Sequence, residues 1–413
     1  MARPSTTASH SSDPSGIVKN TILQCIFRKG EFIIPEISEQ TGFSVTTIAK
    51  YVAELHEQGL LERTECLQTN KRGRKPILYH VRSEAYYFLG VDIRPFELTL
   101  GLMNLQGEMV HIERFPDFRF ENTHNKLDEI CTLITQFTGQ FLLRNRAEIA
   151  GANFNIGGRI NSLQGTSATV FNFEETREIP LTELLSERLR MPVYIENDTK
   201  AMAYGEYAAV VDPTLKNAIY VNVGWGLGLG LIINGEIYYG KDGYSGEFGH
   251  ISHYNNNIMC QCGKKGCIET EVSGSAICRK LIERIHNHET SVLSQKVWEG
   301  EKITIGDIIE ATKLGDRLCV ELITRTASDL GLLLAGLINL LNPDCIILGG
   351  WITKIPSSYF LQPAKQAILK YSLRLLTQHL TILPSMLGSD AGITGACMIA
   401  RKKAIRDRML SKE

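Results

Sequence analysis

The hydrophobic pattern near the N-terminus predicts three short helices. The first runs from Ile17 to a stop signal at Gly30, and the second occupies residues 35–42, with Gly42 as its C-terminal cap. The third follows Ser44, a residue that can cap a helix, and carries apolar residues on one side. Residues 1–16 are rich in Ser, Thr and Pro instead, and we expect a disordered tail there. Two short helices, a turn containing glycine and a longer third helix are typical of a helix-turn-helix.

Two β-prone runs, residues 60–66 and 77–81, follow the predicted helices and flank a basic loop. The basic residues of this loop are Lys71, Arg72, Arg74 and Lys75. The pattern predicts a winged helix-turn-helix over residues 17–82, whose third helix enters the major groove of DNA while the basic hairpin reaches phosphates. On the third helix, the residues expected to face DNA are Val45, Thr46, Thr47 and Lys50. The alternative is a winged helix that contacts only proteins, with the charged run as a solvated turn.

From residue 83 onward the pattern changes to apolar strands that are separated by glycines and followed by amphipathic helices. Strands are predicted at residues 89–93 and 98–104. A second strand–glycine–strand passage is expected at residues 218–240, and two further strands are expected at 193–198 and 344–350. Helices are expected at residues 124–144, 181–190 and 318–342. Two β-rich segments, each followed by helices, predict a two-lobed α/β domain with a cleft between the lobes.

Composition and charge are those of an ordinary globular protein. Of the 413 residues, 43% are hydrophobic and 22% charged, and the formal net charge is −1, so the whole chain has no field that would select nucleic acid or a membrane. The first 82 residues are more basic, with five lysines and six arginines against eight acidic residues. We find no apolar run long enough to span a bilayer and no signal peptide. Most cysteines lie singly, which suits a reducing compartment, and we expect a cytoplasmic protein.

One segment concentrates a histidine and three of the ten cysteines. The spacing is H-x9-C-x-C-x4-C, from His250 through Cys260 and Cys262 to Cys267. One imidazole and three thiolates form a closed tetrahedral shell, which is the usual arrangement for structural zinc and leaves no position for a reactive water. We therefore expect a structural Zn²⁺ ion. The alternative is four unrelated residues, or a disulfide among them.

From about residue 83 to its end, the chain resembles the ROK family of repressors, open reading frames and sugar kinases. The segment GEFGHISHYNNNIMCQCGKKGCIE is similar to the zinc-bearing signature of that family in order and spacing. The resemblance implies an actin-like, hexokinase-like fold, with residues 83–200 and 393–413 as lobe 1. Residues 201–392 would form lobe 2, which carries the zinc loop 250–267. With its N-terminal winged helix, the chain resembles the glucose-responsive and N-acetylglucosamine-responsive repressors of the family.

The resemblance also implies a sugar site. The residues that match the family's sugar contacts are Asn172, Asn197, Asp198, Glu247, His250 and Glu269. In the family's kinases the aspartate matching Asp198 is the general base for the sugar hydroxyl, and the alternative for this residue taken alone is a helix cap. His250 would serve the metal with one ring nitrogen and face the sugar with the other.

The nucleotide half of the implied site departs from the family pattern. Family kinases open with Asp-x-Gly-Gly-Thr, whereas this chain reads Asp92-Ile93-Arg94-Pro95-Phe96-Glu97. Pro95 has no N–H to donate to a phosphate, Phe96 is bulky where the backbone must approach closely, and Glu97 would repel phosphates. Trp225 occupies the family's small hydroxyl position in the second glycine-rich loop. These departures predict a receptor, not an enzyme, in which Asp198 is a vestigial base.

The combined pattern predicts a DNA-binding regulator of carbohydrate metabolism genes, most simply a repressor. It would bind an inverted-repeat operator as a homodimer or a dimer of dimers. A sugar or sugar phosphate would change DNA affinity by favouring one arrangement of the DNA-binding heads, with the metal loop as the mechanical link. The alternative is an active ROK sugar kinase with an accessory DNA-binding head. The last helix, at residues 396–412, is basic and amphipathic and is expected to pack on lobe 1.

Overall fold

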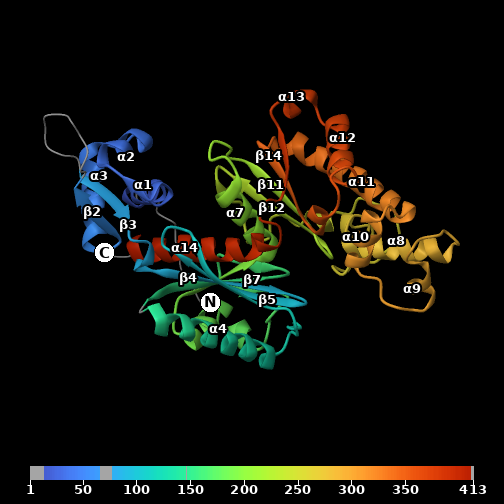
Figure 1. Ribbon diagram of the computed structural model, residues 1–413, viewed down its shortest axis with the longest axis horizontal. Coiled ribbons are helices and arrows are strands. Elements are labelled where there is room, and N and C mark those ends of the chain that lie inside the picture. Colours follow the sequence, from blue (N-terminus) through green and yellow to red (C-terminus); the bar gives the residue numbers. More distant parts are fainter. Residues whose placement is uncertain (1–13, 66–76, 146, 411–413) are drawn as a thin grey trace, which may run out of the picture.

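The computed structural model describes residues 14–65, 77–145 and 147–410 of the chain. Figure 1 shows three groups of elements: a small N-terminal group, a first sheet with its helices and a second sheet with its helices. The predicted basic loop residues Lys71, Arg72, Arg74 and Lys75 and most of the predicted tail lie outside the described residues.

The N-terminal group consists of three helices and a three-stranded antiparallel sheet of order β1-β3-β2. Its elements are α1 (Pro14–Lys29), β1 (Glu31–Phe32), α2 (Ile34–Thr41), α3 (Val45–Glu57), β2 (Leu61–Glu65) and β3 (Ile77–Val81). Ser44 caps α3 by accepting the backbone N–H of Thr47, and Gly42 ends α2 with a φ of 73°, as predicted. The helix α1 begins at Pro14, so residues 14–16 were wrongly assigned to the tail; proline suits the first turn of a helix.

The first sheet has the order β10-β7-β4-β5-β6. Its strands are β4 (Tyr87–Arg94), β5 (Glu97–Asn104), β6 (Met109–Phe115), β7 (Ile149–Ile156) and β10 (Val193–Asn197). The strands β10, β7 and β4 pair in parallel, and β5 and β6 continue the sheet antiparallel. Apolar residues of α4 (His124–Asn145) and α6 (Leu181–Leu189) join one core with the strands. The opposite face carries α14 (Ala391–Leu410), as Figure 1 shows.

The second sheet has the order β13-β12-β11-β14-β15. Its strands are β11 (Ala218–Val223), β12 (Leu227–Ile233), β13 (Glu236–Ile237), β14 (Cys345–Gly350) and β15 (Thr381–Pro384). One face shares a core with the helices α8 (Gly274–His286), α10 (Ile305–Lys313), α11 (Arg317–Leu341) and α12 (Leu361–Tyr371). The other face carries α7 (Asp198–Val210). The remaining short elements are β8 (Ile160–Asn161), β9 (Thr166–Ser167), α5 (Glu175–Glu178), α9 (Ser294–Trp298) and α13 (Arg374–Thr377).

The helices α7 and α14 pack against each other and thereby join the two sheets. Glycines allow this close approach: a Cβ at Gly395 of α14 would overlap the carbonyl oxygen of Ala201 of α7. The C-terminal half of α14 continues to the N-terminal group, where Ala404 and Ile405 enter the same hydrophobic cluster as α1 to α3. The last helix therefore packs on the first sheet, as predicted, and also on the N-terminal group.

A membrane-spanning helix would need to be both long and apolar, and among the described residues no helix meets both conditions.

Candidate functional site

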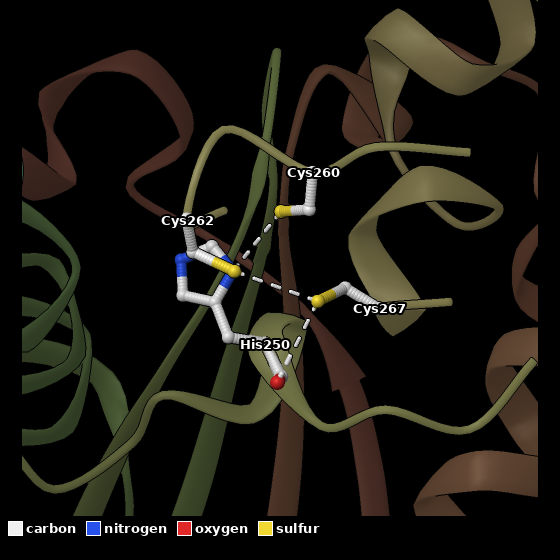
Figure 2. Close-up of side chains that lie close together, drawn as sticks. All are labelled: His250, Cys260, Cys262 and Cys267. Atoms are coloured by element: carbon white, nitrogen blue, oxygen red, sulfur yellow. Dashed lines mark hydrogen bonds between the residues drawn. The ribbon is translucent and has the colours of Figure 1, made fainter. Parts of the chain in front are cut away.

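The four predicted metal ligands lie together (Figure 2). One ligand atom from each of His250, Cys260, Cys262 and Cys267 can be chosen so that all four lie within 4.8 Å of one another. The sulfur of Cys260 is 3.5 Å from Nδ1 of His250, and the sulfurs of Cys262 and Cys267 are 3.6 Å apart. A tetrahedral zinc ion with Zn–S bonds of about 2.3 Å separates its sulfurs by about 3.8 Å. The donor set and its spacing therefore fit a structural zinc ion, and the three thiols are free, not joined in a disulfide.

Backbone hydrogen bonds fold the segment between the ligands into a closed loop. The N–H of Cys260 donates to the carbonyl of Lys264 (2.8 Å), and the N–H of Gly263 donates to the carbonyl of Cys260 (2.9 Å). Gly266 has a φ of 71°, and a Cβ there would overlap the carbonyl oxygen of Tyr254. The loop thus needs glycine where it turns back on itself, and it holds the three sulfurs on one side.

Two carboxylates adjoin the metal ligands. Oε2 of Glu247 lies 3.6 Å from Nε2 of His250, the ring nitrogen that faces away from Cys260. Oε2 of Glu269 accepts the backbone N–H of Leu227 at 2.9 Å, at the start of β12. His250 therefore has one ring nitrogen toward the thiols and the other toward a carboxylate. This arrangement is consistent with the predicted roles of the two nitrogens, one binding the metal and the other facing the sugar.

The pair Asn197 and Asp198 lies at the junction of β10 and α7. Asn197 is the residue that caps α7, because its side-chain oxygen accepts the backbone N–H of Lys200. The helix cap that was the alternative role for Asp198 is therefore provided by Asn197. Its amide donates to the carbonyl of Gly158 and to Oδ1 of Asp198, both at 3.0 Å. Burial raises the pKa of Asp198 to about 6; the N–H of Thr199 opposes this rise. The negative charge of Asp92 adds to the rise in this pKa, and Arg94 opposes it.

Lys200 is a site residue that the sequence analysis missed. It is 4% exposed, and its ammonium donates to the carbonyl of Gly243, four residues before Glu247. Burial lowers its pKa, while the negative charges of Glu196, Glu247 and Asp198 oppose that change. Lys200 thus connects the Asp198 region with the loop that leads to Glu247. The available signal was a lysine two residues after the aspartate of ENDTKA, directly before the apolar residues Ala201 to Ala203.

The remaining predicted sugar residue, Asn172, is exposed and donates to the carbonyl of Ala168 at 3.3 Å. No hydrogen bond links it to the other five predicted sugar residues within the described part of the chain. The structure therefore brings together Asn197 with Asp198 and Glu247 with His250, and it places Glu269 beside the metal ligand candidate Cys260, at 3.7 Å. Among the residues it describes, it does not link Asn172 to them by a hydrogen bond.

The segment Arg94 to Glu97, which we compared with the family's phosphate loop in the sequence, forms the turn from β4 to β5. Asp92 is 1% exposed and pairs with Arg94, whose Nε lies 2.8 Å from Oδ2 of the carboxylate. Phe96 is 63% exposed, with the guanidinium carbon of Arg119 at 5.6 Å and the ammonium of Lys302 at 5.8 Å from its ring centre. Two cationic side chains therefore lie beside the aromatic ring at this turn.

The four predicted DNA-facing residues of α3 differ in exposure. Val45 is 50% exposed, Thr46 and Lys50 are exposed, and Thr47 is half-buried because its hydroxyl contacts that of Ser44 at 2.8 Å. The opposite side of α3 packs into the N-terminal core through Ile48, Tyr51, Val52 and Leu55.

Two five-stranded sheets joined by α7 and α14 are the architecture of an actin-like, hexokinase-like α/β protein. The chain belongs to the ROK family, because the model of that family matches residues 88–403. The xylose repressor of Caldicellulosiruptor bescii is 27% identical over 364 residues, which cover 87% of this chain and 89% of that repressor. The glucokinase of Halalkalibacterium halodurans is 28% identical over 324 residues, which cover 77% of this chain and 96% of that glucokinase.

Solved structures agree with this assignment. The crystal structure of a ROK family transcriptional regulator, described as a homolog of the E. coli MLC protein, matches with a TM-score of 0.81 and 26% identity. This match covers 96% of the present chain and 98% of that regulator. The similarity therefore includes the N-terminal group, which lies outside the residues that the family model matches.

Proposed function

We propose that this protein is a sugar-responsive transcriptional regulator, most simply a repressor of carbohydrate metabolism genes. The observation that carries the proposal is the combination of a ROK domain with an N-terminal group that presents one exposed helix face. The match to a regulator structure over 96% of the chain supports it, whereas the glucokinase alignment leaves about a quarter of the chain unmatched.

The N-terminal group would bind DNA as a winged helix-turn-helix. The third helix, α3, would enter the major groove with Val45, Thr46, Thr47 and Lys50 toward the bases and phosphates. The basic residues 71–75 between β2 and β3 would contact the DNA backbone. A homodimer or a dimer of dimers would present two such helices to an inverted repeat.

The metal would be zinc, held by His250, Cys260, Cys262 and Cys267. A closed shell of four protein ligands leaves no open position, so the ion would order the loop and take no part in a reaction. The loop in turn would hold Glu247 and Glu269 for a sugar. Asn197 and Asp198 would complete the sugar site from the other side, with Asn172 at its edge.

The helix α14 offers a second route, besides the metal loop, from the sugar site to the N-terminal group. Its first turn lies against Asp92, because a Cβ at Gly392 would be 2.5 Å from Oδ2 of that carboxylate. Further along α14, the guanidinium of Arg401 lies 5.1 Å from the ring centre of Phe27 in α1. Ala404 and Ile405 belong to a hydrophobic cluster that includes residues of the N-terminal group and of the first sheet. A sugar that favours one arrangement of the sheets would thereby change the position of α3 and the affinity for DNA.

A kinase activity is the competing proposal, and the family's glucokinases favour it. The turn Arg94 to Glu97 argues against it, because it contains a proline without an N–H and a glutamate where phosphates would bind. We expect no sugar-dependent ATP turnover in a coupled assay. Turnover at ordinary enzyme rates, about one per second or faster, would replace the regulator proposal with the kinase.

DNA binding is tested by fluorescence anisotropy with DNA from the gene's own promoter. We expect binding that weakens steeply as salt rises, because cations are released from the phosphates. Lys50→Ala and the pair Arg72→Ala and Arg74→Ala should each weaken binding by about tenfold or more. The control is Lys370→Ala, which changes a lysine of α12 in the second sheet's layer. Unchanged binding in both variants would contradict the assignment of the N-terminal group.

A further inference from the structure

One arginine of α14 lies at the junction between the N-terminal group and the first sheet. Nε of Arg401 donates to the carbonyl oxygen of Leu105 at 2.7 Å, in the turn between β5 and β6. Its guanidinium carbon lies 5.1 Å from the ring centre of Phe27, a buried residue of α1. A Cβ at Gly107 would lie 3.8 Å from Nη1 of Arg401, so the turn fits closely against the guanidinium. A single side chain of α14 thus contacts both the first sheet and the first helix of the N-terminal group.

The turn between β5 and β6 also contacts the N-terminal group directly. A Cβ at Gly30, at the end of α1, would overlap Nε2 of Gln106, so these two residues are in close contact. The N–H of Leu105 donates at 2.9 Å to the carbonyl of Ser83, in the short helix Ser83–Ala85 that precedes β4. Leu105 and Phe27 belong to the same hydrophobic cluster. The turn that Arg401 binds is therefore the part of the first sheet against which α1 lies.

The guanidinium of Arg401 is not fully satisfied at this junction. Nη2 is buried, and within the described part of the chain it has no hydrogen-bond partner. Burial lowers the pKa of this guanidinium to about 10, a change that Tyr204 alone opposes among the described residues. A buried N–H without an acceptor costs free energy, which an arrangement open to water would recover. This cost opposes the observed position of the N-terminal group, so a modest difference in ligand binding energy is enough to shift it.

The other end of α14 lies beside the predicted sugar residues. The carbonyl of Gly392 accepts the side-chain amide of Asn155, which also donates to Oδ1 of Asp92. The charge of Asp92 in turn acts on Asp198. Arg401 follows Gly392 by nine residues, about 14 Å of helix, and this stretch is largely buried against the first sheet and α7. A displacement of the first turn of α14 therefore reaches Arg401 through a continuous, packed helix.

We propose that Arg401 is the positioning residue through which the state of the sugar site sets the place of the N-terminal group; this inference rests on the proposed function and names a residue that carries its regulation. A sugar that moves the first turn of α14 moves Arg401 relative to Leu105 and Phe27. Because Nη2 lacks an acceptor in the present arrangement, a small displacement exchanges the contact with the Phe27 ring for contact with water. The helix α3 moves with α1, since both share one core, and the affinity for DNA changes with it.

The test is the factor by which saturating sugar changes the dissociation constant of the full chain for its own promoter DNA. The sugars are D-xylose, D-glucose and N-acetylglucosamine. We expect a factor of about five or more in the parent for at least one sugar, and of about two or less in Arg401→Met, which keeps an apolar stem and removes the guanidinium. Arg401→Lys keeps a cation over the Phe27 ring and should give an intermediate factor.

A full parental factor in Arg401→Met would overturn the inference and leave the proposed function intact. If the parent binds DNA and none of the three sugars changes its affinity, the sugar-responsive function fails and the inference fails with it. The matched control is Arg406→Met on the same helix. Arg406 is exposed and pairs with the adjacent Asp407 at 3.1 Å, so the control should keep the parental factor.

A second variant approaches the same contact from the N-terminal group. Phe27→Leu removes the ring and leaves an apolar side chain, and it should reduce the factor as Arg401→Met does. The double variant should reduce it no further, because both substitutions remove one contact. Losses that add in the double variant would show that the two residues act independently and would overturn the inference. Each variant should keep the parental circular dichroism spectrum and still bind the sugar, which excludes unfolding as the cause of a reduced factor.

Discussion

At the residue scale, Asp198 carries a charge whose cost to the fold can be measured. Burial raises the pKa of this carboxyl from 3.8 to about 6. Between these two pH values the folded chain holds the proton and the unfolded chain does not, so the free energy of unfolding falls as pH rises through this interval. Above about pH 6 the full cost of the buried charge is present.

We expect Asp198→Asn to remove this cost while keeping the shape of the side chain. Above pH 6 the free energy of unfolding of the variant should exceed that of the parent by about 1–2 kcal/mol, a value that allows for solvent screening of the charge. The difference should vanish near pH 4. Urea unfolding of both proteins between pH 4 and 8 measures it. The variant should also lose sugar binding. Equal stability of the two proteins at pH 7.5 would contradict the burial of a charged Asp198.

Residues that depend on local sequence were predicted more successfully than residues that depend on distant partners. Ser44 and Gly42 act on the helices next to them, and the structure confirms both. The four predicted metal ligands lie within one short segment, and the structure brings them together. Lys200 was missed because its partner, the carbonyl of Gly243, is 43 residues away in the sequence. Its burial follows from the packing of α7 against the second sheet, which no local pattern reveals.

At the scale of elements, we predict that the loop from His250 to Cys267 depends on a bound metal ion. We expect Cys262→Ser to reduce bound zinc from about one ion per chain to near zero and to lower the melting temperature, because a closed tetrahedral site loses one ligand. Elemental analysis of the purified protein and thermal unfolding measure these changes. Cys131→Ser on α4 is the control, since Cys131 lies outside the cluster, and it should retain the metal. Full zinc content in Cys262→Ser would contradict the ligand set.

The contact between α7 and α14 makes a second prediction at this scale. We expect Gly395→Ala to destabilise the fold by about 2 kcal/mol or more, because the new Cβ would overlap the Ala201 carbonyl between the two sheets. Gly336→Ala on α11 is the matched control, because Gly336 is an exposed helical glycine with open space where a Cβ would be added. Alanine there should raise the free energy of unfolding by about 0.5–1 kcal/mol. Denaturant unfolding compares the two variants. Equal effects would contradict the close packing.

The elements themselves show what periodicity can and cannot reveal. The long amphipathic helices α4 and α11 were predicted within a residue of their observed bounds, because each buries a continuous stripe. The strand β1 was missed, since it has two residues and exists through its pairing with β3. The packing of α14 against the N-terminal group joins segments more than 350 residues apart, and nothing in either segment alone predicts it.

At the scale of the whole molecule, the chain combines a family domain that also occurs in kinases with a group of elements that glucokinase relatives leave unmatched. The sheets, the metal loop and the residues around Asp198 form one connected body, and α14 extends from it to the N-terminal group (Figure 1). A ligand at Asp198 is thus linked through packed elements to α3. The central claim is that sugar binding and DNA binding are coupled through this body.

The most direct measurement of this coupling is the affinity of the full chain for its own promoter DNA, titrated by fluorescence anisotropy with and without a sugar that the chain binds. The account predicts that saturating sugar changes the dissociation constant for DNA by about fivefold or more. By thermodynamic reciprocity, DNA should change the affinity for the sugar by the same factor. A protein that binds both ligands with affinities independent of each other would contradict the account.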